Sequence, residues 1–71
     1  MLTLTWNHYS DDNSYSYFIG GVFLAHADTK EEAQAEAIFI IRAYQNGAHW
    51  AREEFPQLAA LVMGEPLRVA A

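Results

Sequence analysis

The N-terminal part of the chain alternates between apolar and polar positions in three short runs. In residues 2–9, LTLTWNHY, large side chains occupy the even positions, and the odd positions are mostly small or polar. A period of two residues is typical of a strand with one buried face. Residues 15–19, YSYFI, and 22–27, VFLAHA, predict two further strands. Gly20-Gly21 between them predicts a tight two-residue hairpin turn.

The two connections predict which residues face each other across the strands. A turn at Gly20-Gly21 gives the pairs Ile19–Val22, Phe18–Phe23 and Tyr17–Leu24. A four-residue loop at 11–14 gives the pairs Ser10–Tyr15, His8–Tyr17 and Trp6–Ile19. Facing residues share one side of a sheet, so both turns predict one core face: Leu2, Leu4, Trp6, His8, Tyr15, Tyr17, Ile19, Val22, Leu24 and His26. The second face would carry Thr3, Thr5, Asn7, Tyr9, Ser16, Phe18, Phe23, Ala25 and Ala27.

Residues 28–47 change to a helical period. Thr29 followed by Glu32 is a capping box, and Asp28 is an equal candidate for the cap. We predict a helix from Lys30 to Asn46, ended by Gly47 in a left-handed conformation. Its apolar stripe should cover the core face of the sheet, and it consists of Ala33, Ala37, Ile40, Ile41 and Tyr44. Ile38 and Phe39 lie off this stripe and need another partner.

The remaining residues predict a second, interrupted helical segment from Ala48 to Met63. Pro56 lacks a backbone N–H and disfavours a helical residue before it, so it should break or kink the run. The expected apolar anchors are Trp50, Phe55, Leu58, Leu61 and Val62. Gly64 would end the segment, and the tail from Pro66 would be either a short edge strand or frayed. The predicted class is α+β: a three-stranded antiparallel meander, a long helix and a shorter Pro-interrupted helical segment, in a single small domain of residues 1–71.

Composition and charge narrow the function classes. The chain of 71 residues has no cysteine, which excludes disulfides and thiolate metal sites and fits a reducing compartment. It shows no apolar run of membrane-spanning length and no signal-peptide pattern, so we expect a cytoplasmic protein. The net charge is −5, and all of the imbalance precedes residue 42. This disfavours direct nucleic-acid binding and would draw the acidic half to a basic surface, although acidity for solubility is the alternative reading.

The polar residues do not form a recognisable catalytic or metal site. Asp11-Asp12-Asn13-Ser14 has the residue types of a turn, with a cation held by both aspartates as the less favoured alternative. The predicted register places His8 and His26 on one face with tyrosines between them, so we expect no zinc site, no other metal and no cofactor. No serine has a nucleophile-elbow context, and no glycine loop precedes a helix. We therefore expect a protein that is not an enzyme.

The predicted second face carries the strongest binding signal. Phe18 and Phe23 would face each other there, with Tyr9 further along. This aromatic group is either covered by residues 48–63 or exposed, and exposed apolar patches mark interaction surfaces. The candidate partner-binding residues combine these aromatics with the acidic ones: Tyr9, Asp11, Asp12, Phe18, Phe23, Asp28, Glu31, Glu32 and Glu36.

Two resemblances bear on function. A strand running into HADTKEEAQAEA resembles the strand–helix corner of HicB-type antitoxins, although the glycine- and proline-rich segment usual before that helix is missing here. A short, acidic, cysteine-free α+β chain is also similar in type to phage-borne inhibitors such as anti-CRISPR proteins. This resemblance implies that the expected cytoplasm is that of a bacterial or phage-infected host cell. The expected function is a non-catalytic inhibitor or regulator that docks on a basic surface of a nucleic-acid-handling protein complex, without touching nucleic acid or membrane. The alternative is a HicB-like antitoxin or an obligate homodimer joined through the same face.

Overall fold

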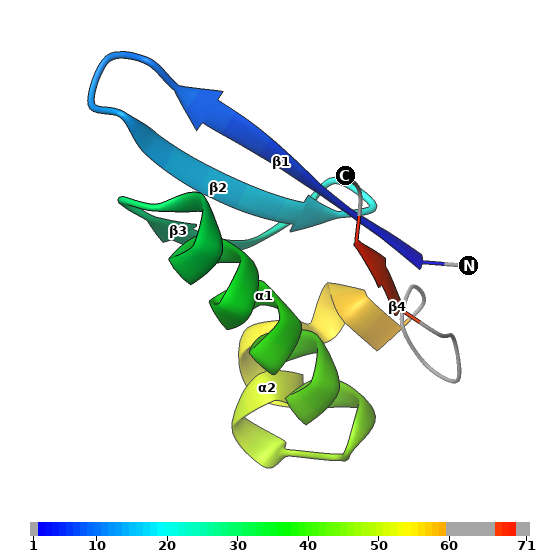
Figure 1. Ribbon diagram of the computed structural model, residues 1–71. Coiled ribbons are helices and arrows are strands. Elements are labelled where there is room, and N and C mark those ends of the chain that lie inside the picture. Colours follow the sequence, from blue (N-terminus) through cyan, green and yellow to red (C-terminus); the bar gives the residue numbers. More distant parts are fainter. Residues whose placement is uncertain (1, 60–66, 70–71) are drawn as a thin grey trace.

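A four-stranded sheet with helices on one face forms the protein (Figure 1). The computed structural model describes residues 2–59 and 67–69. Its elements are β1 (Leu2–Tyr9), β2 (Ser14–Ile19), β3 (Val22–Ala27), α1 (Lys30–Gln45), α2 (His49–Glu54), the 3-10 helix η1 (Pro56–Leu58) and β4 (Leu67–Val69). The strand order is β3-β2-β1-β4, with an antiparallel β1–β2–β3 meander and β4 parallel to β1. The predicted α+β class and meander are confirmed. For the tail, the sequence left two alternatives open, and residues 67–69 form the short edge strand β4.

The turn between β2 and β3 forms where the glycines predicted it. Gly20 and Gly21 have φ angles of 54° and 82°, a left-handed pair that other residues adopt only with strain. Ile19 pairs with Val22 and Phe18 with Phe23, as predicted. The two glycines therefore fix the start of this hairpin by local backbone geometry alone.

The loop between β1 and β2 begins one residue earlier than predicted. Tyr9 pairs with Ser14, so the loop spans residues 10–13 and ends at Asn13, whose φ of 56° is left-handed. The predicted pairs were wrong by two residues, and the observed ones are His8–Tyr15, Trp6–Tyr17 and Leu4–Ile19. A shift of two residues leaves every side chain on its predicted face, because the side-chain period of a strand is two.

A bulge in β3 overturns the prediction for the end of that strand. The register shifts between Tyr17 and Phe18, so Tyr17 faces Ala25 instead of Leu24, and Ser16 faces His26. His26 therefore leaves the predicted core face, and Ala25 and Ala27 join it. The exchange puts alanine beneath α1, which packs on β2 and β3. A small side chain there lets the helix approach, and the polar histidine stays exposed.

The core lies between α1 and the sheet face that it covers. Its buried apolar residues are Leu4, Tyr17, Ile19, Leu24, Ala25, Ala33, Ala37, Ile41, Tyr44, Ala51 and Leu58. The predicted helical stripe is confirmed for all its members except Ile40, which is only partly buried. The N–H of Glu32 donates to Thr29 Oγ1 at 3.2 Å, so Thr29 is the cap. The helix ends at Gln45, one residue before the predicted end, and Gly47 follows with a φ of 87°.

The predicted break at Pro56 is confirmed, but one predicted anchor is wrong. α2 ends at Glu54, and Pro56 opens η1, whose Leu58 is fully buried. Trp50 is 41% exposed, and its neighbour Ala51 takes the buried position. Trp50 instead stacks on Phe39, with ring centroids 5.7 Å apart, which gives Phe39 its missing partner. The predicted anchors Leu61 and Val62 lie outside the described residues. None of the described helices has the length and apolarity to cross a membrane.

Candidate protein-binding surface

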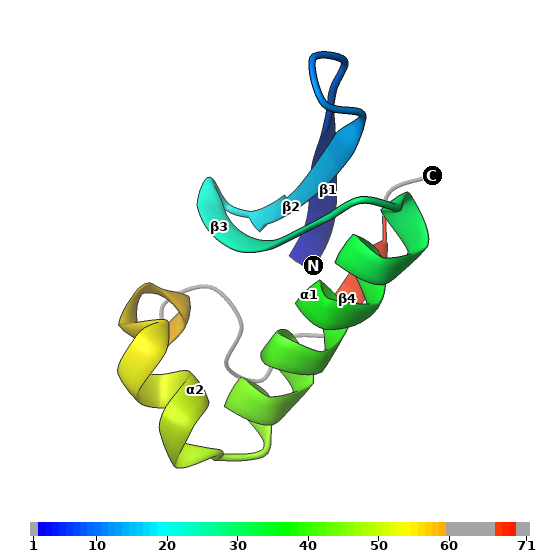
Figure 2. The ribbon, with the colours of Figure 1, turned by 90° about the vertical axis from the view of Figure 1, so that its left-hand side faces the viewer.

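The described helices leave the sheet face opposite α1 uncovered. α1 packs on β2 and β3, and α2 packs mainly on α1 (Figure 2). We call the opposite side the open face. It consists of Thr3, Thr5, Asn7, Tyr9, Ser16, Phe18, Phe23 and His26. All of these except Ser16 are exposed or half-buried. Of the two alternatives that the sequence left open, the described part of residues 48–63 therefore does not cover this face.

The open face carries a pair of phenylalanines at its glycine-turn end. The rings of Phe18 and Phe23 meet edge to face, with centroids 5.8 Å apart and an interplanar angle of 69°. Phe23 is 50% exposed and Phe18 is half-buried. This is the cross-strand pair that the sequence predicted. Tyr9, also exposed, lies further along the face, beyond Asn7 and Ser16. The three aromatics therefore share one face, but Tyr9 is separate from the phenylalanine pair.

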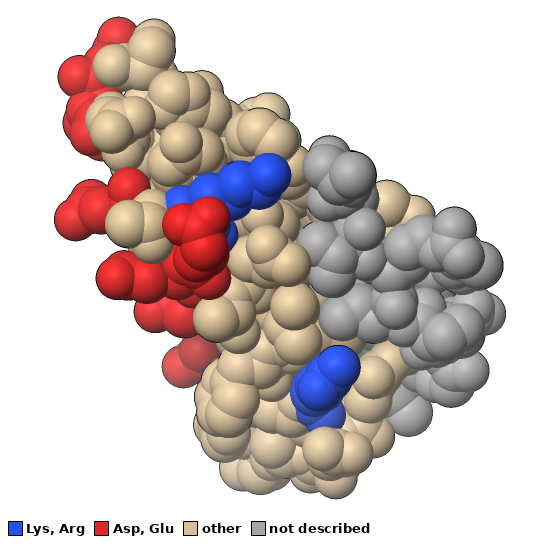
Figure 3. All heavy atoms as spheres, viewed as in Figure 1, with Lys and Arg blue, Asp and Glu red and all other residues tan. Residues whose placement is uncertain are grey.

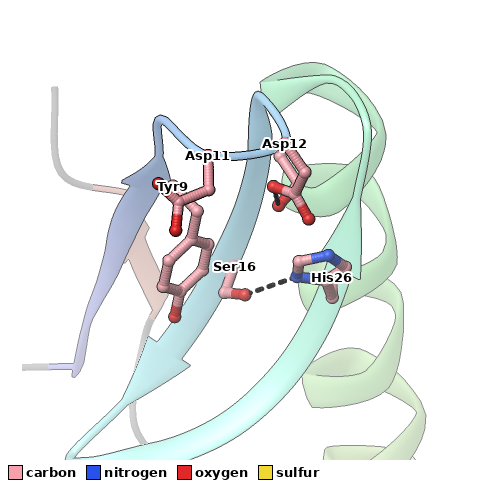
Figure 4. A pocket seen from close by; sticks show the side chains of 6 residues that line it. Tyr9, Asp11, Asp12, Ser16 and His26 are labelled. Carbon is pink, nitrogen blue, oxygen red and sulfur yellow. Dashed lines mark hydrogen bonds between the residues drawn. The ribbon is translucent and has the colours of Figure 1, made fainter.

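Tyr9 borders a shallow hollow at the hairpin tip (Figure 4). The hollow has a volume of about 400 Å³ and is lined by Tyr9, Asp11, Asp12, Ser14, Ser16 and His26. Ser16 Oγ lies 2.8 Å from His26 Nδ1, and the ring of Tyr9 approaches that of His26 with centroids 6.0 Å apart. The hollow therefore brings the tip aspartates, Asp11 and Asp12, next to Tyr9 and His26 of the open face.

A hydrogen bond favours the ionised form of one carboxylate of the hollow. Ser14 Oγ donates to Asp12 Oδ1 at 2.6 Å, and this bond is the main cause of the lowered pKa of Asp12. Desolvation of the carboxylate opposes this by raising the pKa, and the electrostatic interaction with His26 lowers it by a smaller amount. Both aspartates are exposed, so the tip presents negative charge to any approaching partner.

The three histidines lie apart. His8 stacks on Tyr15 with centroids 4.6 Å apart, and its Nε2 lies 2.8 Å from Asn13 Oδ1. His26 lies on the open face, so the prediction that His8 and His26 share a face was wrong. His49 Nε2 lies 3.0 Å from Glu53 Oε1 within α2. Within residues 2–59 and 67–69, no three His, Cys, Asp or Glu side chains come close enough to hold a metal ion.

The other acidic candidates gather at the beginning of α1. Asp28, Glu31, Glu32 and Glu36 are all exposed. Together with the tip aspartates they form an acidic side of the molecule, which Figure 3 shows along the hairpin tip and α1. None of these carboxylates is in an ion pair with another described residue. Lys30, the cation in their midst, instead lies over the ring of Trp6, 4.1 Å from its centroid.

The candidate residues therefore occupy two surfaces instead of one. Tyr9, Phe18 and Phe23 lie on the open face, and the acidic residues of α1 belong to the opposite layer. The tip aspartates border both. Sequence reasoning missed His26, Ser14 and Ser16 as members of the hollow, because the bulge that turns His26 outward leaves no recognisable signal in VFLAHA. It also missed the exposed Phe39–Trp50 stack, although the position of Phe39 off the helical stripe was a signal.

Comparisons of the chain with protein-family models, with curated proteins and with solved structures found no match.

Proposed function

We propose that this protein is a non-catalytic inhibitor or regulator that docks on a basic protein surface, of the kind that nucleic-acid-handling complexes present to phosphate groups. Its setting would be the cytoplasm of a bacterial or phage-infected cell. The observation that carries the proposal is the open face, whose exposed aromatic side chains lie on a sheet that is bordered at the hairpin tip by carboxylates. These carboxylates have no cationic partner among the described residues.

The aromatic residues would supply most of the binding energy. Large side chains held rigidly in a sheet bury much apolar area at little cost in conformational entropy, and such residues dominate measured interface energies. Phe18 holds Phe23 in an edge-to-face contact, so Phe23 is already oriented in the free protein. An aromatic residue that is half exposed in a small domain loses water contact when a partner covers it, which favours association.

The carboxylates would supply direction and specificity. Six exposed acidic side chains on one side of an 8.0 kDa chain attract a cationic surface over distances of about 10 Å at 0.1 M salt. The lowered pKa of Asp12 keeps its charge in mildly acidic solution. By covering cations that would otherwise contact phosphates, the bound protein would block access of nucleic acid to its partner.

The test isolates a partner and asks which surface holds it. Tagged wild-type protein is used to capture partners from a bacterial extract, in parallel with Phe23→Ser and Phe39→Ser. Both phenylalanines are exposed, so both substitutions should leave the fold intact, but only Phe23 belongs to the open face. We expect capture to be lost with Phe23→Ser and kept with Phe39→Ser.

Two further readouts make this result specific to the proposed function. Added double-stranded DNA should displace this protein from the captured partner, and rising salt should weaken the complex because charge contributes to it. Capture that survives Phe23→Ser, or a partner that binds DNA and this protein simultaneously, contradicts the proposal. Urea denaturation of each variant confirms that the losses do not arise from unfolding.

A further inference from the structure

β3 forms an edge of the sheet, and its outer side is unpaired among the strands that the structure describes. The strand order ends at β3, and no described strand pairs with its outer edge (Figures 1 and 2). Ile19 and Val22 flank the two-residue turn and pair with each other, so the next residue, Phe23, directs its own N–H and C=O away from β2. A row of such groups is a template for another strand.

The β3 edge lacks most features that keep edges from pairing. Its sequence, VFLAHA, has no charged residue and no proline. The bulge near its middle is the one protective feature that its described residues show. Phe23 lies on this edge and is 50% exposed toward the open face. An added strand would therefore meet an apolar side chain on that face.

The charges around the same edge indicate the chemistry of the strand that fits it. β3 runs directly into Asp28 and the acidic start of α1, and α1 packs on β3. In the common view of Figures 1 and 3, the acidic side chains lie on the side of the molecule that carries β3 and the beginning of α1. The edge therefore lies between Phe23 on the open face and exposed carboxylates on the helical layer.

The geometry points to strand addition: an extended, basic segment of the protein partner pairs with the outer edge of β3 as a fifth strand of the sheet. Successive side chains of a strand alternate between faces, so alternating basic and apolar residues would place cations toward α1 and apolar groups against Phe23. This inference rests on the proposed function and specifies how its partner is held. It also explains how one ligand can reach both the open face and the acidic residues of α1.

A second copy of the chain is a poorer occupant of this edge. Two β3 strands paired antiparallel about a two-fold axis would place both α1 helices on the same side of a joined sheet. Each copy carries a net charge of −5, so self-pairing joins two molecules of like charge. Charge complementarity therefore favours a basic segment over self-pairing.

The test uses a defined probe, an eight-residue peptide of alternating lysine and valine, and follows amide hydrogen exchange in the protein by NMR. At saturation we expect exchange of the Phe23 amide to slow by about tenfold or more, with amides of β1 unchanged. The same peptide with every backbone nitrogen methylated keeps its charge but cannot pair as a strand, and it should give no protection. A glutamate–valine peptide should not bind.

A charge variant gives an independent measure. Asp28→Asn/Glu31→Gln should weaken binding of the lysine–valine peptide about fivefold, since each exposed charge contact contributes modestly. Glu53→Gln/Glu54→Gln changes the net charge equally on α2 and should have little effect. If both lysine peptides bind equally well without protecting Phe23, strand addition is wrong while docking on a basic surface stands. If neither lysine peptide binds, strand addition is also wrong, and the proposed function is then tested separately by the capture experiment.

Discussion

At the scale of single residues, the hairpin tip is held by a few short contacts. Ser14 Oγ donates to Asp12 Oδ1, His8 Nε2 lies within hydrogen-bond distance of Asn13 Oδ1, and Asn13 adopts the left-handed conformation that asparagine tolerates better than most residues. These contacts close the loop and position the Asp12 carboxylate at the hollow. The tip is therefore an ordered acidic element, although all four residues of its loop are exposed.

The first prediction concerns the Asp12 carboxyl group. Ser14→Ala removes the hydroxyl that lowers the pKa of Asp12, so this pKa should rise toward its ordinary value of 3.8. Because the folded-state pKa lies below the unfolded one, the bond contributes stability above pH 4 or so, and this contribution is lost as pH falls through the folded-state pKa. An NMR titration of wild type and variant measures the shift. An unchanged Asp12 pKa would show that the backbone of residue 14, and not its hydroxyl, holds the charge.

At the scale of elements, local signals fix the ends of the helix and the start of the β2–β3 hairpin, and tertiary packing fixes the register of β3 beyond the bulge. α1 begins at the Thr29 cap and stops before Gly47, both of which are readable in the sequence. The bulge in β3 has no such signal. It arises where the sheet meets α1, because Leu24 and Ala25 can both be buried only if the strand accommodates one extra residue.

The second prediction concerns the cap of α1. Thr29→Ala should lower the free energy of unfolding by about 1 kcal/mol, because the N–H of Glu32 loses its acceptor. Thr29→Ser retains a hydroxyl and should cost much less. Urea denaturation of the three proteins measures the difference, and equal losses for alanine and serine would assign the effect to the threonine methyl group instead of the cap.

The third prediction tests the bulge directly. The chain has no cysteine, so paired substitutions report on register without interference. Ser16→Cys/His26→Cys should form a disulfide on mild oxidation, because these residues face each other across β2 and β3. Ser16→Cys/Ala25→Cys, the pair that an unbulged hairpin would bring together, should remain reduced. Efficient cross-linking of the second pair alone would show that the bulge is absent and that His26 lies on the core face.

At the scale of the whole molecule, the sheet has two unlike faces. One packs against α1 and holds the core, and the other carries exposed aromatic side chains. A domain of this size has little stability in reserve, so the two faces should respond very differently to substitution. Substitutions on the exposed face can therefore be used to distinguish binding to a foreign partner from self-association.

The fourth prediction uses that contrast. Leu4→Ala removes a fully buried side chain and should cost about 2–5 kcal/mol, whereas Phe23→Ser should cost about 1 kcal/mol or less. Sedimentation should find a monomer for both wild type and Phe23→Ser. A wild-type dimer that Phe23→Ser dissociates, with loss of stability, would favour the antitoxin-like homodimer over a foreign partner.

The local pattern of the sequence determined the features that depend on a few adjacent residues. The strand period, the glycine pair, the Thr29 cap and Pro56 each impose a backbone conformation regardless of what packs nearby, so the meander, α1 and the break before η1 were predictable. The Phe18–Phe23 pair followed from the glycine turn for the same reason.

Only the tertiary structure decided the features that depend on which surfaces meet. Burial beneath α1 placed Ala25 inside and turned His26 onto the open face, where it completes the hollow with Tyr9 and Asp12. Packing of α2 on α1 buried Ala51 in place of Trp50. The sequence supplied the aromatic and acidic residues of the candidate site, but their division between two faces on either side of the β3 edge is a property of the packed layers, because a side chain's exposure depends on residues distant in the chain.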